Sequence, residues 1–328
     1  MKILILTHAE VQELLPVREC IPVMTEALAD LARGNVFQPL RMIVTPPSAE
    51  GDMALMPSYR SGVHAAYGVK IVCVFPANPA KGLDAHQGSV MLFSAETGEL
   101  MALMNASAIT AIRTAAVSGV ATQLLSRPDA SDLAIIGSGV QARAHIEAMA
   151  CVRTLKRARV ASYRFENATK FADELAARYE FPIEPVESVE AALRGAEIIV
   201  TATTAAQPIL KREWVSPGAH LNVVGSSIPS TREVDGATLA ATSLFVDRRE
   251  STINEGGDYL FALRDGAIGP DHIRAEIGEV VIGKHPGRTS QDEITLFKSL
   301  GLAVEDLASA EYLYHKALES QAGTWVDF

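Results

Sequence analysis

The sequence of 328 residues is long enough for two domains, and 48% of its residues are hydrophobic, which is enough for a sizeable core. It carries 29 basic and 39 acidic side chains, and the formal net charge of −10 argues against a nucleic-acid surface but permits a local cationic site for an anionic substrate. Three widely spaced cysteines without a CxxC pair predict neither a disulfide framework nor a metal site. The chain shows no signal-peptide pattern and no run of about 18 apolar residues, so we expect a cytoplasmic protein without a membrane partner.

The first 104 residues are predicted to hold two helical segments followed by a strand-rich region. Thr7 and Glu10 form a capping-box pattern that begins the first helix, and Gly34 is a natural C-cap for the second, which is expected from Cys20. Beyond residue 37, short apolar runs alternate with turn residues, which predicts an antiparallel or mixed sheet. The expected strands are 41–44, 53–56, 66–74 and 89–93.

A change of pattern near residues 127–131 marks a predicted domain boundary, after a helix expected at 105–125. From Asp132 on, strands alternate with helices, which predicts a parallel, doubly wound α/β sheet, the Rossmann arrangement. The segment 295–318 is predicted to form one long helix. The expected strands are 133–136, 159–162, 198–202, 220–224 and 243–247, and the expected helices are 140–150, 167–179 and 189–193.

The hexapeptide GSGVQA at 137–142 lies between the first of these strands and its helix, where a dinucleotide-binding loop belongs. Gly137 permits the tight turn, Gly139 lets backbone N–H groups approach a pyrophosphate, and Ala142 lets the helix pack close to the strand. The helix N-terminus then stabilises the phosphate charge. In this context an ordinary glycine-rich turn is the weaker alternative, and the pattern predicts a nicotinamide-dependent oxidoreductase.

The residues after the second Rossmann strand favour NADP(H) over NAD(H). NAD enzymes place an acid there for the ribose 2′-hydroxyl, whereas this chain has Ser162 and, two residues later, Arg164. A guanidinium pairs with the 2′-phosphate that a carboxylate would repel. Arg164 as a plain surface arginine is the alternative, and Glu166 could still bind the ribose, so NAD(H) remains open.

Seven segments spread along the chain carry a recognisable pattern. They are QPLR at 38–41, GVK at 68–70, HQ at 86–87, TAIRTAA at 110–116, GSGVQA at 137–142, WVSPGAH at 214–220 and FKSLGLAVED at 297–306. With these segments the chain resembles the ornithine cyclodeaminase/mu-crystallin family along nearly its full length. The resemblance implies a homodimer in which 127–303 form the Rossmann domain, and in which 1–126 with 304–328 form an α+β substrate-binding and dimerisation domain.

The resemblance also implies a basic trio that holds the substrate carboxylate, and it maps onto Arg41, Lys70 and Arg113. Their chemistry agrees, because a guanidinium binds a carboxylate with two hydrogen bonds and a lysine adds a point charge. The alternatives are a surface charge for Arg41, an edge-strand lysine for Lys70 and a structural salt bridge for Arg113. His86 is a further substrate-binding candidate, with a satisfied polar residue as its alternative.

Two departures from the family pattern concern acids. Ornithine cyclodeaminases carry a catalytic aspartate where this chain has Ser227, and a substrate-site glutamate where it has Ala54. The resemblance is therefore nearer to the mu-crystallin branch. The candidate cofactor-binding residues are Gly137, Gly139, Val140, Gln141, Ser162, Arg164, Thr203, Ser226, Ser227 and Leu302.

The expected reaction is NADPH-dependent reduction of a C=N bond next to a carboxylate, in a cyclic ketimine or an α-imino acid. Arg41 and Arg113 would anchor the carboxylate, and Lys70 would exchange a proton or polarise the substrate, so Lys70 and Arg113 are the catalytic candidates. The alternatives are an amino-acid dehydrogenase of alanine-dehydrogenase type, an ornithine cyclodeaminase, and a protein that binds NADPH or another ligand without turnover.

Overall fold

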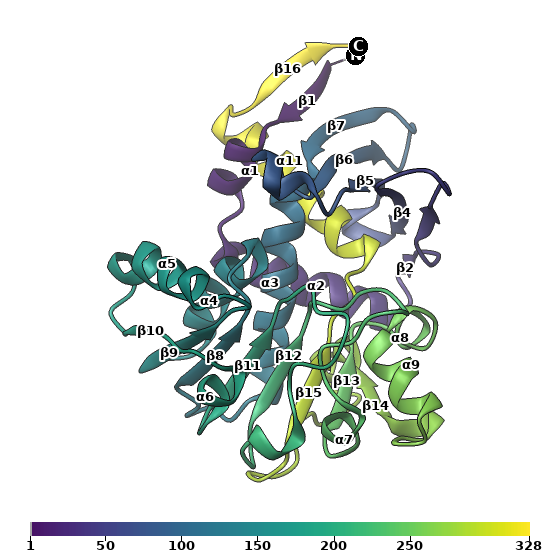
Figure 1. Ribbon diagram of the computed structural model, residues 1–328. Helices are drawn as coiled ribbons and strands as arrows, with labels where there is room; N and C mark the ends of the chain where they lie inside the picture. Colours follow the sequence, from purple (N-terminus) through teal and green to yellow (C-terminus); the bar gives the residue numbers. More distant parts are fainter. Residues whose placement is uncertain (1) are drawn as a thin grey trace. The chain divides into compact units, whose positions relative to one another are not determined.

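The computed structural model describes residues 2–328, which fold as two units (Figure 1). The first unit contains the residues up to Arg113 together with Leu302–Phe328, and the second is Thr114–Gly301. The first unit is α+β and the second is a Rossmann domain. The fold class expected from the sequence is therefore confirmed.

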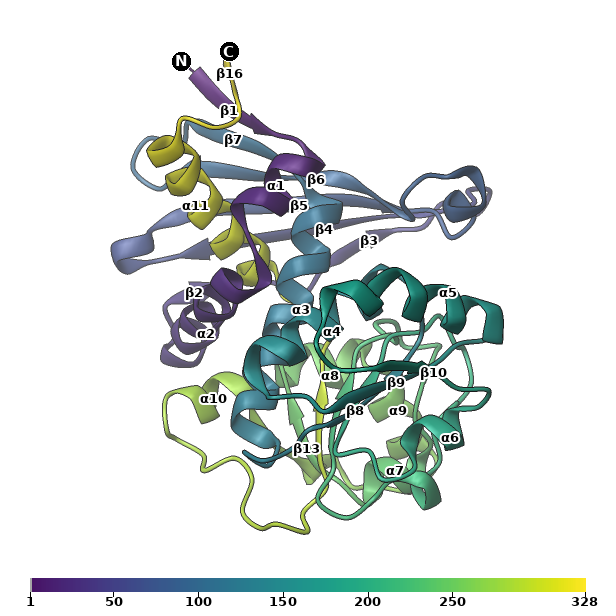
Figure 2. The ribbon, with the colours of Figure 1, turned by 90° about the vertical axis from the view of Figure 1, so that its left-hand side faces the viewer.

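The first unit is built on a mixed eight-stranded sheet in the order β16-β1-β7-β6-β5-β4-β2, with β3 also paired to β4. Adjacent strands from β4 to β7 are antiparallel, whereas β1 is parallel to β7. The strands are β1 Lys2–Leu6, β2 Val36–Phe37, β3 Met42–Val44, β4 Asp52–Arg60, β5 Ala66–Val74, β6 His86–Ser94, β7 Leu100–Asn105 and β16 Thr324–Asp327. Its helices and 3-10 turns are α1 His8–Leu14, α2 Val17–Arg33, α11 Ala303–Ser320, η1 Gly62–His64 and η2 Asn78–Lys81. Helix α11 packs on β4, β5 and β6 and against α2 (Figure 2).

The boundaries of the first two helices follow from local chemistry. Thr7 and Glu10 form the predicted capping box at the start of α1, and Gly34 ends α2 with φ +81°, a conformation that glycine adopts without strain. Helix α2 starts at Val17, directly after Pro16 and earlier than the predicted Cys20. Proline is compatible with a helix start because it has no N–H to leave unpaired there.

Strand β4 continues through Pro57, although the sequence suggested a turn at that residue. On one side β4 pairs with β5 along its whole length. On the other side it pairs with β3 at residues 53–55 and with β2 at residues 59–60, so the segment 56–58 lies opposite neither strand. Proline is tolerated in a strand where one side of its backbone is unpaired, as it is here.

The second unit is an eight-stranded sheet in the order β10-β9-β8-β11-β12-β15-β13-β14, and every pairing in it is parallel. Its strands are β8 Asp132–Ile136, β9 Arg157–Ala161, β10 Ile183–Pro185, β11 Ile198–Thr201, β12 His220–Val223, β13 Ser243–Val246, β14 Ile273–Glu276 and β15 Thr295–Lys298. Its helices and 3-10 turns are α4 Val140–Val152, α5 Phe165–Leu175, α6 Val189–Leu193, α7 Gly236–Ala240, α8 Arg249–Glu255, α9 Gly257–Arg264, α10 Ile277–Val281, η3 Ala176–Arg178, η4 Arg212–Trp214 and η5 Pro270–His272. The chain order reverses between β8 and β11, and open α/β sheets bind ligands at such a point.

The single long helix predicted at 295–318 is wrong. Thr295–Lys298 forms β15, which is buried between β12 and β13, and α11 begins only at Ala303. The break lies at Gly301, with φ +82°, and the buried Asp247 carboxylate accepts hydrogen bonds from the N–H groups of Leu300 and Gly301. A short apolar run cannot be assigned to strand or helix by its periodicity alone.

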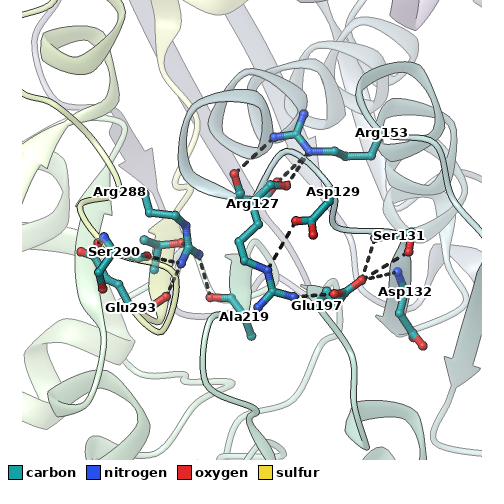
Figure 3. Close-up of polar contacts among 12 residues, drawn as sticks. Arg127, Asp129, Ser131, Asp132, Arg153, Glu197, Ala219, Arg288, Ser290 and Glu293 are labelled. Atoms are coloured by element: carbon teal, nitrogen blue, oxygen red, sulfur yellow. Dashed lines mark hydrogen bonds and ion pairs between the residues drawn. The ribbon is translucent and has the colours of Figure 1, made fainter.

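Helix α3, Ala106–Leu125, contains the first division between the units, at 113/114 instead of the predicted 126/127. Its C-terminal half packs within the second unit, where Thr122 accepts a hydrogen bond from Asn222. Arg153, which follows α4, donates to the carbonyl oxygen of Thr122 in the last turns of α3 and to that of Arg127 just after the helix; Figure 3 shows Arg153 beside Arg127. The second division lies at 301/302, two residues before the predicted 303/304, and Asp247 binds the loop that precedes it.

Helix α3 is also the single helix of residues 2–328 that is long and apolar enough to cross a membrane. Most of it is buried inside the protein, as the core helix of a globular unit would be.

Candidate functional site

The substrate-site candidates converge on a buried cluster of charges within the first unit. Lys70 on β5 and Arg113 on α3 are 3% and 4% exposed, and both contact the acids at the start of α11. The Lys70 Nζ lies 2.7 Å from Asp306 Oδ2, and the Arg113 Nε lies 3.0 Å from Asp306 Oδ1. The Arg113 Nη1 lies 2.6 Å from Glu305 Oε2. Two cations and two carboxylates therefore share one water-poor cluster.

The sequence of β5 explains why Lys70 points into this cluster. Side chains alternate between the two faces of a strand, and Gly68, Lys70 and Val72 belong to the buried face. A Cβ added at Gly68 would lie 2.8 Å from Leu307 Cδ1, so α11 runs close above this part of the strand. The glycine thus lets the helix approach, and the approach places the α11 acids beside Lys70.

The first turn of α11 is arranged to hold acidic side chains. Gln38 is buried and its Oε1 accepts a hydrogen bond from the N–H of Val304. Glu305 and Asp306 follow in that turn, where the partial positive charge of a helix N-terminus stabilises carboxylates. The QPLR segment therefore has two parts in the site. Its Gln38 binds the N-terminus of the helix that carries the acids, and its Arg41 is a substrate-binding candidate.

The pKa values in the cluster reflect its burial and its charges. Desolvation lowers the pKa of Lys70 to about 8, against the attraction of Asp306, and Arg113 and Arg41 lower it further. Desolvation raises the pKa of Asp306, but Arg113 and Lys70 outweigh it and hold this pKa below its usual value. The pKa of His86 is also lowered, because its ring is partly desolvated and Lys70 and Arg113 lie near, although the residue as a whole is exposed. Lys70 is therefore poised to gain and lose a proton near neutral pH.

The structure brings Lys70 and Arg113 into direct contact with one shared acid, Asp306, and it places Arg41 and His86 within electrostatic range of Lys70. The acids themselves were not singled out from the sequence, although Glu305 and Asp306 end the FKSLGLAVED segment. Two adjacent acids within the apolar stretch LGLAVEDLASA at 300–310 would have been the available signal, because buried carboxylates need cationic partners.

The cofactor candidates lie in the second unit, where the loop after β8 has the predicted dinucleotide-binding geometry. Gly137 has φ +118°, and a Cβ there would lie 2.4 Å from the carbonyl oxygen of Ala202. Gly139 occupies the N-cap of α4 without a side-chain cap, and a Cβ there would meet nothing within 4 Å. Ala142 is fully buried beneath the helix, whereas Val140 is 58% exposed and Gln141 is half-buried. An uncapped helix N-terminus beside open space fits a pyrophosphate.

The second Rossmann strand, β9, ends at Ala161 and is followed by the two residues predicted to read the ribose. The Ser162 and Ser138 hydroxyls lie 2.8 Å apart, so Ser162 is tied to the glycine-rich loop. Arg164 is exposed and precedes α5 as its N-cap. The acid that an NAD-binding domain places at this strand end is replaced here by a hydroxyl and a nearby guanidinium.

A buried carboxylate organises the ends of β11 and β12. Glu233 accepts hydrogen bonds from the hydroxyl of Thr201, from both the N–H and the hydroxyl of Thr203, and from the N–H of Gly225. These four bonds measure 2.7–2.8 Å. Desolvation raises the pKa of Glu233, and the neighbouring Lys298 counteracts that shift.

Ser226 and Ser227 continue this edge of the sheet. Ser226 is buried, and its hydroxyl bonds to Thr231 within the same loop, while Ser227 is half-buried beside it. The Ser226 side chain is thus engaged in shaping the loop. Leu302 lies outside this unit, as the buried N-cap residue of α11. Across residues 2–328, no group of three or more His, Cys, Asp or Glu side chains is placed to hold a metal ion.

Comparison with known proteins shows that the substrate-site candidates and the cofactor candidates both lie within the region matched by one family. The model of the ornithine cyclodeaminase/mu-crystallin family matches residues 1–321. Ketimine reductase mu-crystallin of Mus musculus is 40% identical over 297 residues, which cover 90% of this chain and 90% of that protein.

Two solved structures share the whole fold. The structure of Thermococcus litoralis Delta(1)-pyrroline-2-carboxylate reductase in complex with NADH and L-proline has a TM-score of 0.95 at 39% identity, covering 98% of this chain and 99% of that one. An archaeal alanine dehydrogenase dimer with bound NAD has a TM-score of 0.93 at 34% identity, with complete coverage of both chains. The similarity therefore extends over both units.

Proposed function

The chain belongs to the ornithine cyclodeaminase/mu-crystallin family, and on this premise we propose that it is an NAD(P)H-dependent oxidoreductase that reduces a C=N bond adjacent to a carboxylate. The substrate is a cyclic ketimine, such as a pyrroline- or piperideine-2-carboxylate, or a small α-imino acid. The cluster of buried cations formed by Lys70 and Arg113, with Arg41 near it, is the observation that carries this proposal. With Arg41, three cations stand against the two carboxylates Glu305 and Asp306, so this site of a chain with net charge −10 keeps an excess positive charge for an anionic substrate.

Each basic residue has a distinct part in this reaction. Arg41 and Arg113 bind the substrate carboxylate and thereby orient the imine. Lys70 gives a proton from its ammonium group to the imine nitrogen, so that an N–H bond breaks on Lys70 and forms on the product. Lys70 then regains a proton from solvent. The bound nicotinamide supplies the hydride that the imine carbon receives.

The glycine-rich loop and the ends of β11 and β12 hold the dinucleotide. Backbone N–H groups at the start of α4 bind the pyrophosphate, since Gly139 leaves open space there. We further propose that NADPH is preferred, because Ser162 leaves the ribose without a carboxylate partner and Arg164 lies two residues away. NADH is the alternative, supported by the cofactors of the two similar structures.

The chemistry at two positions separates this proposal from the cyclodeaminase alternative. Ser227 and Ala54 offer no carboxylate for the amine-handling steps that the family's cyclodeaminases perform. An amino-acid dehydrogenase would use the same basic cluster, and dependence on free ammonia distinguishes it from an imine reductase.

The experiment is NADPH or NADH oxidation at 340 nm with piperideine-2-carboxylate, pyrroline-2-carboxylate, and pyruvate with ammonia. Turnover of a cyclic imine without ammonia supports the proposal. Turnover with pyruvate and ammonia alone reassigns the protein as an amino-acid dehydrogenase. Tight NADPH binding with no turnover of any substrate indicates a binding protein. A Lys70→Met variant that keeps full turnover would remove Lys70 from the mechanism.

We also propose that the protein is a cytoplasmic homodimer. The edge of the first unit's sheet presents an apolar strip formed by Met42, Ile43 and Val44 of β3, which are 62%, 47% and 45% exposed. Contiguous apolar surface of this kind is typical of protein interfaces. Light scattering should give twice the chain mass of 35.1 kDa, and an Ile43→Lys variant should shift the protein toward the monomer.

A further inference from the structure

Asp306 divides its carboxylate between the two candidate catalytic cations. One oxygen lies 2.7 Å from the Lys70 ammonium and the other lies 3.0 Å from the Arg113 Nε, with Asp306 itself 1% exposed. The neighbouring Glu305 contacts Arg113. Asp306 is thus the carboxylate in contact with Lys70, and it also binds the Nε of the Arg113 guanidinium.

We propose that Asp306 is a positioning residue of the imine-reduction site, which keeps the buried Lys70 protonated and aligned and which fixes the plane of the Arg113 guanidinium. This inference rests on the proposed function and deepens it. Asp306 stays ionised throughout the cycle and exchanges no proton with the substrate.

The groups that face Lys70 show why it needs such a partner. Helix α3 contributes Arg113 and the Thr110 hydroxyl, which lies 3.4 Å from the ammonium, and Arg41 and His86 approach from the β2–β3 connection and from β6. Burial and neighbouring cations both favour the neutral amine. The Asp306 carboxylate opposes them, and its attraction holds the pKa of Lys70 at about 8 instead of lower.

The position of Asp306 is itself held by the fold. It lies in the first turn of α11, whose Val304 N–H is capped by Gln38, so the carboxylate is stabilised from behind by the helix N-terminus. If the negative charge of Asp306 were removed, the buried Lys70 would still have the cations Arg113 and Arg41 near it. Lys70 would then be neutral at neutral pH and unable to donate a proton to the imine.

The pH dependence of kcat/KM for imine reduction tests this role in Asp306→Asn, with Asp306→Glu as the conservative variant. The alkaline limb near pH 8 should move to lower pH by at least about one unit in the asparagine variant, because a carboxylate in contact with a cation shifts its pKa by that order. The glutamate variant should restore most of the wild-type profile. The titration of the substrate itself is common to all variants, so a difference between them reports the enzyme group.

Glu305→Gln is the matched control, since it removes a buried acid one residue away that contacts Arg113. It should raise KM for the imine while leaving the alkaline limb nearly in place. An equal shift of the limb in Glu305→Gln and Asp306→Asn would overturn the assignment, because the effect would then be a general loss of negative charge.

A second readout does not depend on turnover. The 13Cε resonance of Lys70, assigned by Lys70→Arg, should titrate near pH 8 in the wild-type protein and at lower pH in Asp306→Asn. An unchanged titration would refute the role of Asp306, even if imine reduction is established. Failure of every imine to react would refute the proposed function instead, and the resonance would still decide the relation between Asp306 and Lys70. If Asp306→Asn does not fold, Asp306→Ala, which also removes the carboxylate, takes its place in both measurements, and an unchanged Lys70 titration in that variant contradicts the role of Asp306.

Discussion

Glu233 accepts two hydrogen bonds from Thr203, one from its backbone N–H at 2.8 Å and one from its hydroxyl at 2.7 Å. A fully buried carboxylate with this many donors acts as a fixed acceptor around which the loop after β11 is built. The adjacent Gly225 leaves no room for a side chain, because a Cβ there would lie 2.4 Å from Glu233 Oε1. The two loops that carry cofactor candidates are thus joined through one side chain.

Replacing Glu233 should therefore weaken cofactor binding more than substrate binding. Glu233→Ala leaves the N–H groups of Thr203 and Gly225 without their acceptor, at a cost of about 3 kcal/mol in the free energy of unfolding. We expect KM for NADPH to rise about tenfold or more while KM for the imine changes little. Steady-state kinetics with each substrate varied in turn, together with urea unfolding, provide the measurement. A rise confined to the imine KM would contradict the assignment.

The glycine-rich loop gives a paired prediction from two glycines with different surroundings. Gly137→Ala places a Cβ against the Ala202 carbonyl at positive φ, so it should lower stability by about 2 kcal/mol and abolish dinucleotide binding. Gly139→Ala meets no protein atom within 4 Å and loses only the modest N-cap preference for glycine, so it should cost less stability than Gly137→Ala yet still weaken dinucleotide binding. Thermal unfolding and fluorescence titration with NADPH separate the two effects. Equal stabilities of the two variants would show that the strain argument is wrong.

Much of the second unit was predictable because its signals are local. Short apolar strands, the glycine pattern and the helix at Val140 lie within a few residues of one another, and the structure has them nearly where the sequence placed them. The capping box at Thr7 is predictable for the same reason, since its two hydrogen bonds join residues three positions apart.

The remaining features depend on contacts between distant parts of the chain. The strand character of Thr295–Lys298 is decided by β12 and β13 on either side, not by its own periodicity. The partners of Asp306 lie 193 and 236 residues away, and Thr203, a partner of Glu233, lies 30 residues away beyond β12. No spacing rule along the sequence therefore pairs them. The basic trio was visible only through resemblance, and the acids that complete it are seen only once α11 is placed against β5.

Acid should destabilise the protein through buried histidines. His145 is fully buried between Ser118 and the Gln141 carbonyl, and desolvation lowers its pKa from 6.5 to about 4. The unfolded chain therefore binds the proton first as pH falls, so stability is full above about pH 7 and declines toward pH 4. Between pH 7 and 5 this group alone should cost about 2 kcal/mol.

The measurement for His145 compares urea unfolding at pH 7 and pH 5 in the wild-type protein and in His145→Gln, which cannot titrate. The variant should lose about 2 kcal/mol less than the wild type over this interval. Identical slopes in the two proteins would mean that His145 is protonated with its ordinary pKa in the folded state.

Substitutions at Ser162 and Arg164 test whether the protein prefers NADPH or NADH. Arg164→Ala removes the guanidinium proposed to bind the 2′-phosphate, so kcat/KM for NADPH should fall about tenfold while that for NADH stays nearly constant. Ser162→Asp places a carboxylate at the end of β9, where it should repel the 2′-phosphate and bind the ribose hydroxyls, and thus invert the preference toward NADH. Ser162→Asp also loses the 2.8 Å contact between the Ser162 and Ser138 hydroxyls. Ser162→Ala is the control for this loss, because it removes the contact without adding a charge. If Arg164→Ala lowers kcat/KM equally for both cofactors, Arg164 supports the fold of this loop and does not select the cofactor.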